Sequence, residues 1–110
     1  MRLGDYEIRV ISGGRFRLDG GGMFGVVPKP LWEREHPADA RNRIALDTNC
    51  LLVCGGDEVV LIDTGNGSKL SPKEREIFDL APGDPLLANL AAAGIAPEAV
   101  TAVVFSHLHL

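Results

Sequence analysis

Residues 103–110 read Val-Val-Phe-Ser-His-Leu-His-Leu, an apolar run that leads directly into two histidines. The β-branched and apolar residues at its start predict a buried strand. Where a chain is extended, side chains two positions apart share one face, with Cα atoms roughly 6–7 Å apart. Neutral imidazole binds metal ions well, so His107 and His109 could converge on one ion. The alternative is a strand end that carries two exposed histidines.

Three upstream segments extend this pattern. Residues 60–65 form an apolar run that ends in Asp-Thr-Gly, residues 94–103 contain Gly-Ile-Ala-Pro-Glu before the last strand, and residues 21–28 read Gly-Gly-Met-Phe-Gly-Val-Val-Pro. Taken in their order along the chain, these segments and the terminal histidines resemble the metallo-β-lactamase-fold hydrolases, in which His-x-His-x-Asp-His follows a buried strand. Residues 21–28 resemble a branch that includes lactonases acting on acylated homoserine lactones.

The resemblance implies an α/β fold. The chain would form the amino-terminal half of an αββα sandwich, with mostly antiparallel strands and two helices. Residues 1–110 would then be a partial domain, truncated inside the first metal-binding loop, because the Asp and the third His of the pattern would follow Leu110.

The resemblance also implies the roles of individual residues. His107 and His109 would bind the first of two divalent ions, expected to be Zn²⁺. Two ions about 3.5–4 Å apart can bridge a hydroxide and polarise a carbonyl. Asp63 would hold the metal loop and orient its ligands, although it could also be a simple turn former. Met23 and Phe24 would line the substrate pocket, or they would form a small apolar cluster with Trp32.

We therefore expect a metal-dependent hydrolase that cleaves a lactone or an ester with a metal-bound hydroxide. The alternatives are a glyoxalase-type thioesterase and a non-catalytic binding or scaffold module. The 110 residues alone are expected to be inactive, because a catalytic zinc site usually needs three protein ligands. The expected partner is a small-molecule substrate. His36 lies beside a proline in a polar segment and is expected to be solvated rather than a ligand.

Composition is consistent with a small globular domain. Of the 110 residues, 45% are hydrophobic and 24% charged, with a net charge of −4. This acidic balance gives no reason to expect binding to nucleic acid or to an anionic membrane. There is no apolar stretch of about 20 residues and no signal-peptide pattern, so a cytoplasmic protein is expected. Cys50 and Cys54 lie in one expected strand, about 13 Å apart, too far for a disulfide. We expect both to be small, partly buried apolar residues.

Local patterns predict the order of the elements. Residues 6–11 and 15–19 are predicted as a hairpin with a turn at 12–14, and residues 44–54 and 58–63 as a second hairpin. Residues 23–32 are expected to be irregular. One helix begins after Ser71, with a capping box to Glu74. A second begins at residues 84–85 and ends at Gly94, and residues 97–100 form at most one turn.

Residues 20–25 also match the dinucleotide-binding pattern Gly-x-Gly-x-x-Gly. That function requires a helix that begins at the glycines and directs its amino terminus at the pyrophosphate. Pro28 and Pro30 follow closely and argue against such a helix. We therefore expect no dinucleotide site.

Overall fold

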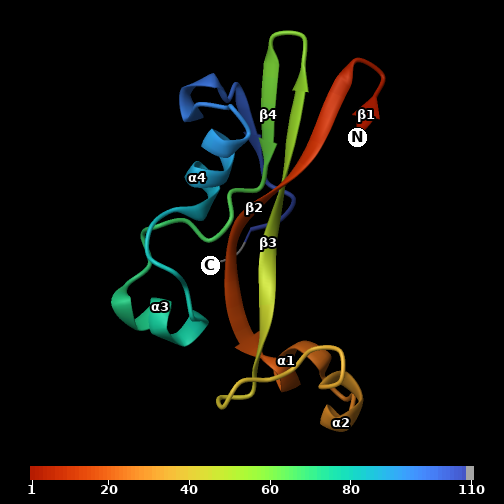
Figure 1. Ribbon diagram of the computed structural model, residues 1–110, viewed down its shortest axis with the longest axis vertical. Coiled ribbons are helices and arrows are strands. Elements are labelled where there is room, and N and C mark those ends of the chain that lie inside the picture. Colours follow the sequence, from red (N-terminus) through yellow and green to blue (C-terminus); the bar gives the residue numbers. More distant parts are fainter. Residues whose placement is uncertain (109–110) are drawn as a thin grey trace. The chain divides into compact units, whose positions relative to one another are not determined.

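The computed structural model describes residues 1–108, which contain a five-stranded sheet in the order β1-β2-β3-β4-β5 (Figure 1). Pairs β1–β2 and β3–β4 are antiparallel, and β4–β5 is parallel. The prediction of an α/β fold with mostly antiparallel strands is therefore confirmed. The bounds are β1 Arg2–Leu3, β2 Tyr6–Asp19, β3 Arg43–Gly55, β4 Glu58–Ile62 and β5 Ala102–Val104.

The chain divides into two compact units. The first contains residues 1–14, residues 48–69 and the chain from residue 82 onward. The second contains residues 15–47 and 70–81. Strands β2 and β3 contribute residues to both units.

The core of the first unit lies between the sheet and helix α4 (Pro85–Ala92), which Figure 1 shows beside β4. Alternation in the strands directs one set of side chains to this helix. Leu52 is fully buried and Leu90 is 2% exposed. The buried members of this cluster are Ile11, Cys50, Leu52, Leu61, Leu86 and Leu90. Both cysteines are free thiols; Cys54 is partly buried, as predicted, whereas Cys50 is buried more completely than predicted.

The two predicted helix starts are confirmed, because each depends on local capping. The Asp84 carboxylate accepts a hydrogen bond from the Leu87 N–H at the start of α4, and Gly94 follows its end with φ +79°. In helix α3 (Pro72–Phe78), the side chain of Ser71 accepts from the Glu74 N–H, and the Glu74 carboxylate accepts from the Ser71 N–H. This reciprocal pair is the capping box that the sequence predicts.

The connection from α4 to β5 passes through the short 3₁₀ helix η1 (Pro97–Ala99), as expected for residues 97–100. Thr101 then joins β4 through three hydrogen bonds to one residue. Its N–H and its hydroxyl both donate to the Val59 carbonyl, and its hydroxyl accepts from the Val59 N–H. These bonds fix where β5 begins alongside β4.

The predicted hairpin at residues 6–19 is wrong, because β2 is one continuous strand of 14 residues. The glycines at its centre do not form a turn. A Cβ at Gly13 would lie 2.5 Å from the Gly65 Cα, so the absence of a side chain permits two backbones to approach closely. A long-range contact, rather than a local turn, therefore explains Gly13.

In the second unit, the expectation of irregular structure over residues 23–32 is also wrong. Helices α1 (Gly20–Phe24) and α2 (Lys29–Trp32) occupy most of this segment. The Asp19 carboxylate accepts from the Gly22 N–H and caps α1, while Pro30 stands in the first turn of α2, where no N–H is needed. A helix thus does begin at Gly20, but it ends at Phe24, before either proline.

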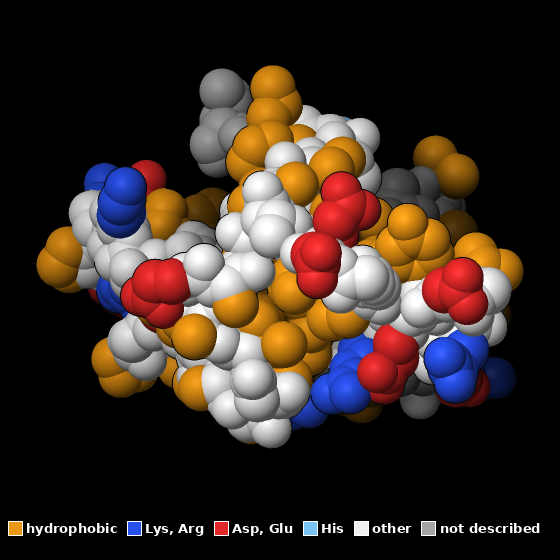
Figure 2. Space-filling model, turned by 90° about the horizontal axis from the view of Figure 1, so that it is seen from above, with side chains coloured by type: hydrophobic (Ala, Val, Ile, Leu, Met, Phe, Trp, Pro, Cys, Tyr) orange, Lys and Arg blue, Asp and Glu red, His pale blue; other side chains and the backbone are white. Residues whose placement is uncertain are grey.

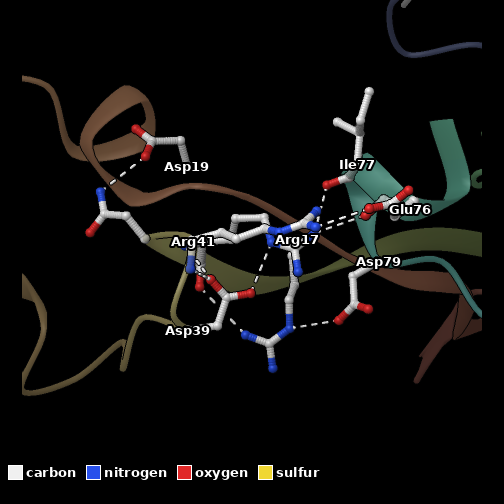
Figure 3. Close-up of polar contacts among 9 residues, drawn as sticks. Arg17, Asp19, Asp39, Arg41, Glu76, Ile77 and Asp79 are labelled. Carbon is white, nitrogen blue, oxygen red and sulfur yellow. Dashed lines mark hydrogen bonds and ion pairs between the residues drawn. The ribbon is translucent and has the colours of Figure 1, made fainter. Parts of the chain in front are cut away.

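Arginines attach α3 to the strands of the second unit (Figure 3). Arg43 is 16% exposed at its side chain, pairs with Asp39 at 2.8 Å and donates to the carbonyls of Glu76 and Ile77. Two more ion pairs lie nearby, the partly buried Arg17 with Asp79 at 3.0 Å and the exposed Arg41 with Glu76 at 2.9 Å. Arg43 is thus a partly buried cation at the carboxyl end of α3, where the helix dipole favours positive charge.

None of the helices among residues 1–108 has the length and apolar character needed to span a membrane.

Candidate metal centre

Asp63 lies at the edge of the sheet where β4 and β5 both end. Because these strands are parallel and Ile62 pairs with Val104, their carboxyl ends meet there. The Asp63 N–H donates to the Val104 carbonyl at 2.8 Å, and its φ is +63°. The residue therefore leaves the ladder in a left-handed conformation that aspartate tolerates better than most residues.

The Asp63 carboxylate holds Ser106, the second residue after the end of β5. Its Oδ1 accepts from the Ser106 N–H at 2.9 Å, and its Oδ2 accepts from the Ser106 hydroxyl at 2.6 Å. Both carboxylate oxygens thus contact one residue, 43 positions away in sequence. This contact is the kind of loop-holding interaction that the resemblance implies for Asp63.

His107 adjoins this pair. Its Nδ1 lies 2.8 Å from the Ser106 Oγ, so Asp63, Ser106 and His107 form one chain of hydrogen bonds. The His107 residue is exposed. An imidazole is therefore presented to solvent just past the carboxyl end of β5. The strand itself is exposed, with Val103 at 47% and Val104 at 48%, so the prediction of a buried strand is wrong.

The other predicted ligand, His109, lies outside the described residues. Among residues 1–108, no three His, Cys, Asp or Glu side chains are grouped so that they could hold a metal ion. His107 is one donor of a type that suits Zn²⁺ or a similar ion, and its orientation by a hydrogen-bonded neighbour is typical of metal-binding histidines. The described residues therefore supply one side chain, His107, that is suited to bind a metal ion.

The segment after Asp63 is fixed against β2. Gly65 has φ +67° and lies against the Gly13 backbone. The Asn66 side chain and the Thr48 hydroxyl both donate to the Gly14 carbonyl, at 3.1 and 2.9 Å. The Asp-Thr-Gly sequence therefore combines a carboxylate that contacts the loop with a glycine that allows close backbone packing.

Sequence reasoning did not single out Ser106, Gly13, Thr48 or Asn66. A signal existed for Ser106, which lies between the apolar strand and the first histidine. Gly13 carried a misleading signal, because paired glycines between two apolar runs usually indicate a turn. Thr48 and Asn66 have no local signature.

Met23 and Phe24, the predicted substrate-binding residues, belong to α1 in the second unit. Met23 is 50% exposed. The Phe24 ring stacks on Trp32 with centroids 5.1 Å apart and an interplanar angle of 11°, and the His36 ring lies 5.3 Å from Phe24. Phe24 thus packs in a local aromatic cluster with Trp32, as in the alternative interpretation, and its role in substrate binding stays a prediction. His36 is exposed, as expected.

Residues 43–110 match the sequence profile of the Metallo-beta-lactamase superfamily. The chain belongs to this superfamily. Among curated proteins, none matches the chain closely in sequence.

Solved structures resemble the chain over almost its whole length. A probable metal-dependent hydrolase from Staphylococcus aureus has 37% sequence identity and a TM-score of 0.87, and the match covers 99% of this chain and 40% of that protein. The hydrolase AbOPH has 25% identity and a TM-score of 0.72, with 99% of this chain and 35% of that protein covered.

AidC, described as a dizinc quorum-quenching lactonase in complex with the product N-hexanoyl-L-homoserine, has 23% identity and a TM-score of 0.70. The match covers 99% of this chain and 35% of AidC, and at this identity it supports the fold alone. The chain therefore spans between 35% and 40% of the length of these three proteins.

Proposed function

We propose that this chain is the amino-terminal part of a metal-dependent hydrolase that cleaves a lactone or an ester. The observation that carries the proposal is the placement of His107. It follows a strand whose end is hydrogen-bonded to Asp63, in a chain that belongs to the metallo-beta-lactamase superfamily. The similar structures are longer, which supports a partial domain.

In the proposed site, His107 and His109 would hold one divalent ion, and a third ligand would come from residues beyond Leu110. When bound, two divalent ions supply the nucleophile and the Lewis acidity that hydrolysis requires. The described residues of this chain would position the metal-binding loop. Asp63 holds Ser106, and Ser106 contacts the ring of His107, so the loop after β5 is attached to the end of β4 at Ser106.

The proposed lactone or ester specificity depends on residues 21–28. An exposed Met23 offers an apolar, flexible surface of the kind that suits an acyl chain. Phe24, which is partly buried in its stack on Trp32, would add apolar surface beside Met23. The likeness to AidC concerns the fold alone, and the existence of a lactonase with this fold is compatible with the proposal.

The proposal is tested on the protein as its gene encodes it, loaded with zinc or manganese. An acyl lactone, a simple ester, a thioester and a β-lactam are compared as substrates. We expect lactone or ester turnover that a chelator abolishes and that is lost in His107→Ala. The control is His36→Ala, which removes an exposed imidazole and should leave the metal content unchanged. Preference for the thioester would favour the glyoxalase-type alternative, and absence of metal-dependent turnover would refute a hydrolase.

A further inference from the structure

We propose that Ser106 is a positioning residue that sets the tautomer of His107, so that the ring proton resides on Nδ1 and the lone pair on Nε2. The proposal rests on the proposed function only in the use that it gives to Nε2, as a metal-binding atom. The tautomer itself follows from the hydrogen-bond chain from Asp63 to His107.

The direction of each bond in this chain follows from counting protons. An ionised carboxylate only accepts hydrogen bonds. The Ser106 hydroxyl has a single proton, and its 2.6 Å contact with Asp63 Oδ2 has the short length of an O–H···O⁻ bond. That proton therefore points to Asp63. The 2.8 Å contact between Ser106 Oγ and His107 Nδ1 then requires the ring nitrogen to be the donor.

The hydroxyl cannot easily turn away from this arrangement. The Ser106 N–H also donates to the same carboxylate, through Oδ1 at 2.9 Å, so two bonds hold the serine to Asp63. Asp63 is itself attached to β5 by the bond from its N–H to the Val104 carbonyl. The acceptor presented to His107 is therefore anchored to the sheet.

This anchoring matters because a histidine without such a neighbour prefers the opposite arrangement. In water, neutral imidazole side chains favour the proton on Nε2. Which ring nitrogen can bind a metal is decided by the hydrogen bond that the other nitrogen makes. Ser106 would therefore reverse the intrinsic preference of His107 before any ion arrives, and so reduce the reorganisation that binding requires.

The test uses the metal-free protein, as its gene encodes it, with ¹⁵N-labelled histidine at a pH where the imidazoles are neutral. Long-range ¹H–¹⁵N spectra distinguish a protonated ring nitrogen from an unprotonated one, and His107→Gln identifies the signals. We expect wild-type His107 to carry its proton on Nδ1. Ser106→Ala should shift the population to Nε2–H, and Ser106→Thr, which keeps the hydroxyl, should restore the wild-type pattern.

Zn²⁺ competition with a chelator gives a second readout. Because the substitution removes a neighbour rather than a ligand, Ser106→Ala should weaken binding roughly 10–100-fold, with recovery in Ser106→Thr. Wild-type His107 with its proton on Nε2, or an unchanged tautomer in Ser106→Ala, would overturn the proposal. If the wild-type tautomer is as expected but no metal binds, the proposed function fails and the role of Ser106 in setting the ring stands.

Discussion

The backbones of Gly13 and Gly65 touch. A Cβ on Gly65 would lie 2.5 Å from the Gly13 Cα, and a Cβ on Gly13 would lie 2.5 Å from the Gly65 Cα. Real Cβ atoms do not approach other atoms so closely, so neither position accepts a side chain without movement of the backbone. The contact joins β2 to the segment that follows Asp63 and explains why the strand passes through two glycines without turning.

Gly65→Ala should therefore destabilise the fold by more than the cost of placing alanine in a left-handed backbone conformation. A left-handed residue with a side chain costs about 1–2 kcal/mol. Gly67 provides a matched control, because it has φ +65° but no atom within 4 Å of its built Cβ. Urea unfolding should give a clearly larger loss for Gly65→Ala than for Gly67→Ala. Equal losses would mean that the close approach to Gly13 is not required.

Arg43→Ala should loosen α3 much more than Arg41→Ala. Arg43 is 16% exposed at its side chain and contacts Asp39 and two carbonyls of α3, whereas Arg41 is 58% exposed and forms one ion pair. Hydrogen bonds to a charged group that is shielded from water contribute more to stability than an exposed ion pair does. Hydrogen exchange of the amides in Pro72–Phe78 measures the difference. Similar exchange rates in both variants would contradict this assignment.

The stability of the second unit should fall in acid. The Arg43 backbone N–H, followed by the Arg43 side chain, lowers the pKa of the Asp39 carboxyl from 3.8. A lowered native pKa stabilises the fold above the unfolded-state pKa, and this contribution is lost as the pH falls through the native pKa. Urea unfolding should therefore show stability decreasing below about pH 4.

Asp39→Asn is the control for this pH dependence. It keeps the shape of the side chain but cannot titrate, so its stability should change less over the same acid range. The Asp19 carboxyl, whose pKa is lowered by hydrogen bonds from Asn42 and then Gly22, should add to the dependence that remains. An Asp39→Asn curve parallel to that of the wild type would show that this carboxyl is not responsible.

The 110-residue chain, on its own, should associate with itself. Hydrophobic side chains reach the surface at several places (Figure 2). On the strands of the first unit, Val10 is 65% exposed and Val104 48% exposed. Exposed apolar groups of this kind favour association. Size-exclusion chromatography with light scattering should detect oligomers, and Val10→Lys should reduce them. A monodisperse monomer with a sharp thermal transition would refute this expectation.

The sequence predicts those parts of the fold that depend on neighbours in the chain. The Ser71–Glu74 capping box, the Asp84 cap and the β3–β4 hairpin are determined within a few residues, and all three are present. The continuity of β2 could not be predicted in this way. It depends on Gly65, which is 52 positions from Gly13, and the local glycine pattern favours a turn.

The same distinction between local and long-range determinants applies to the residues of the candidate site. His107 could be predicted because its place after an apolar strand is a local pattern, which the family resemblance reinforced. The role of Ser106 could not, because it depends on a hydrogen bond to Asp63 across the parallel pair of β4 and β5. No spacing in the sequence shows which strands become neighbours, so a chain of hydrogen bonds that crosses them emerges only from the fold.

Three substitutions, made in the protein as its gene encodes it, test whether His109 binds a metal ion or only packs against its neighbours. If His109 is a ligand, His109→Ala should lose about one equivalent of metal and most activity while the fold remains. Asp63→Asn keeps the shape of the side chain but removes the charge that holds Ser106, so metal affinity or activity should fall roughly 10–100-fold. His36→Ala, which changes an exposed ring, should have a negligible effect. Metal content by mass spectrometry and lactone hydrolysis rates measure all three, and a full metal complement in His109→Ala would contradict the assignment of this histidine as a ligand.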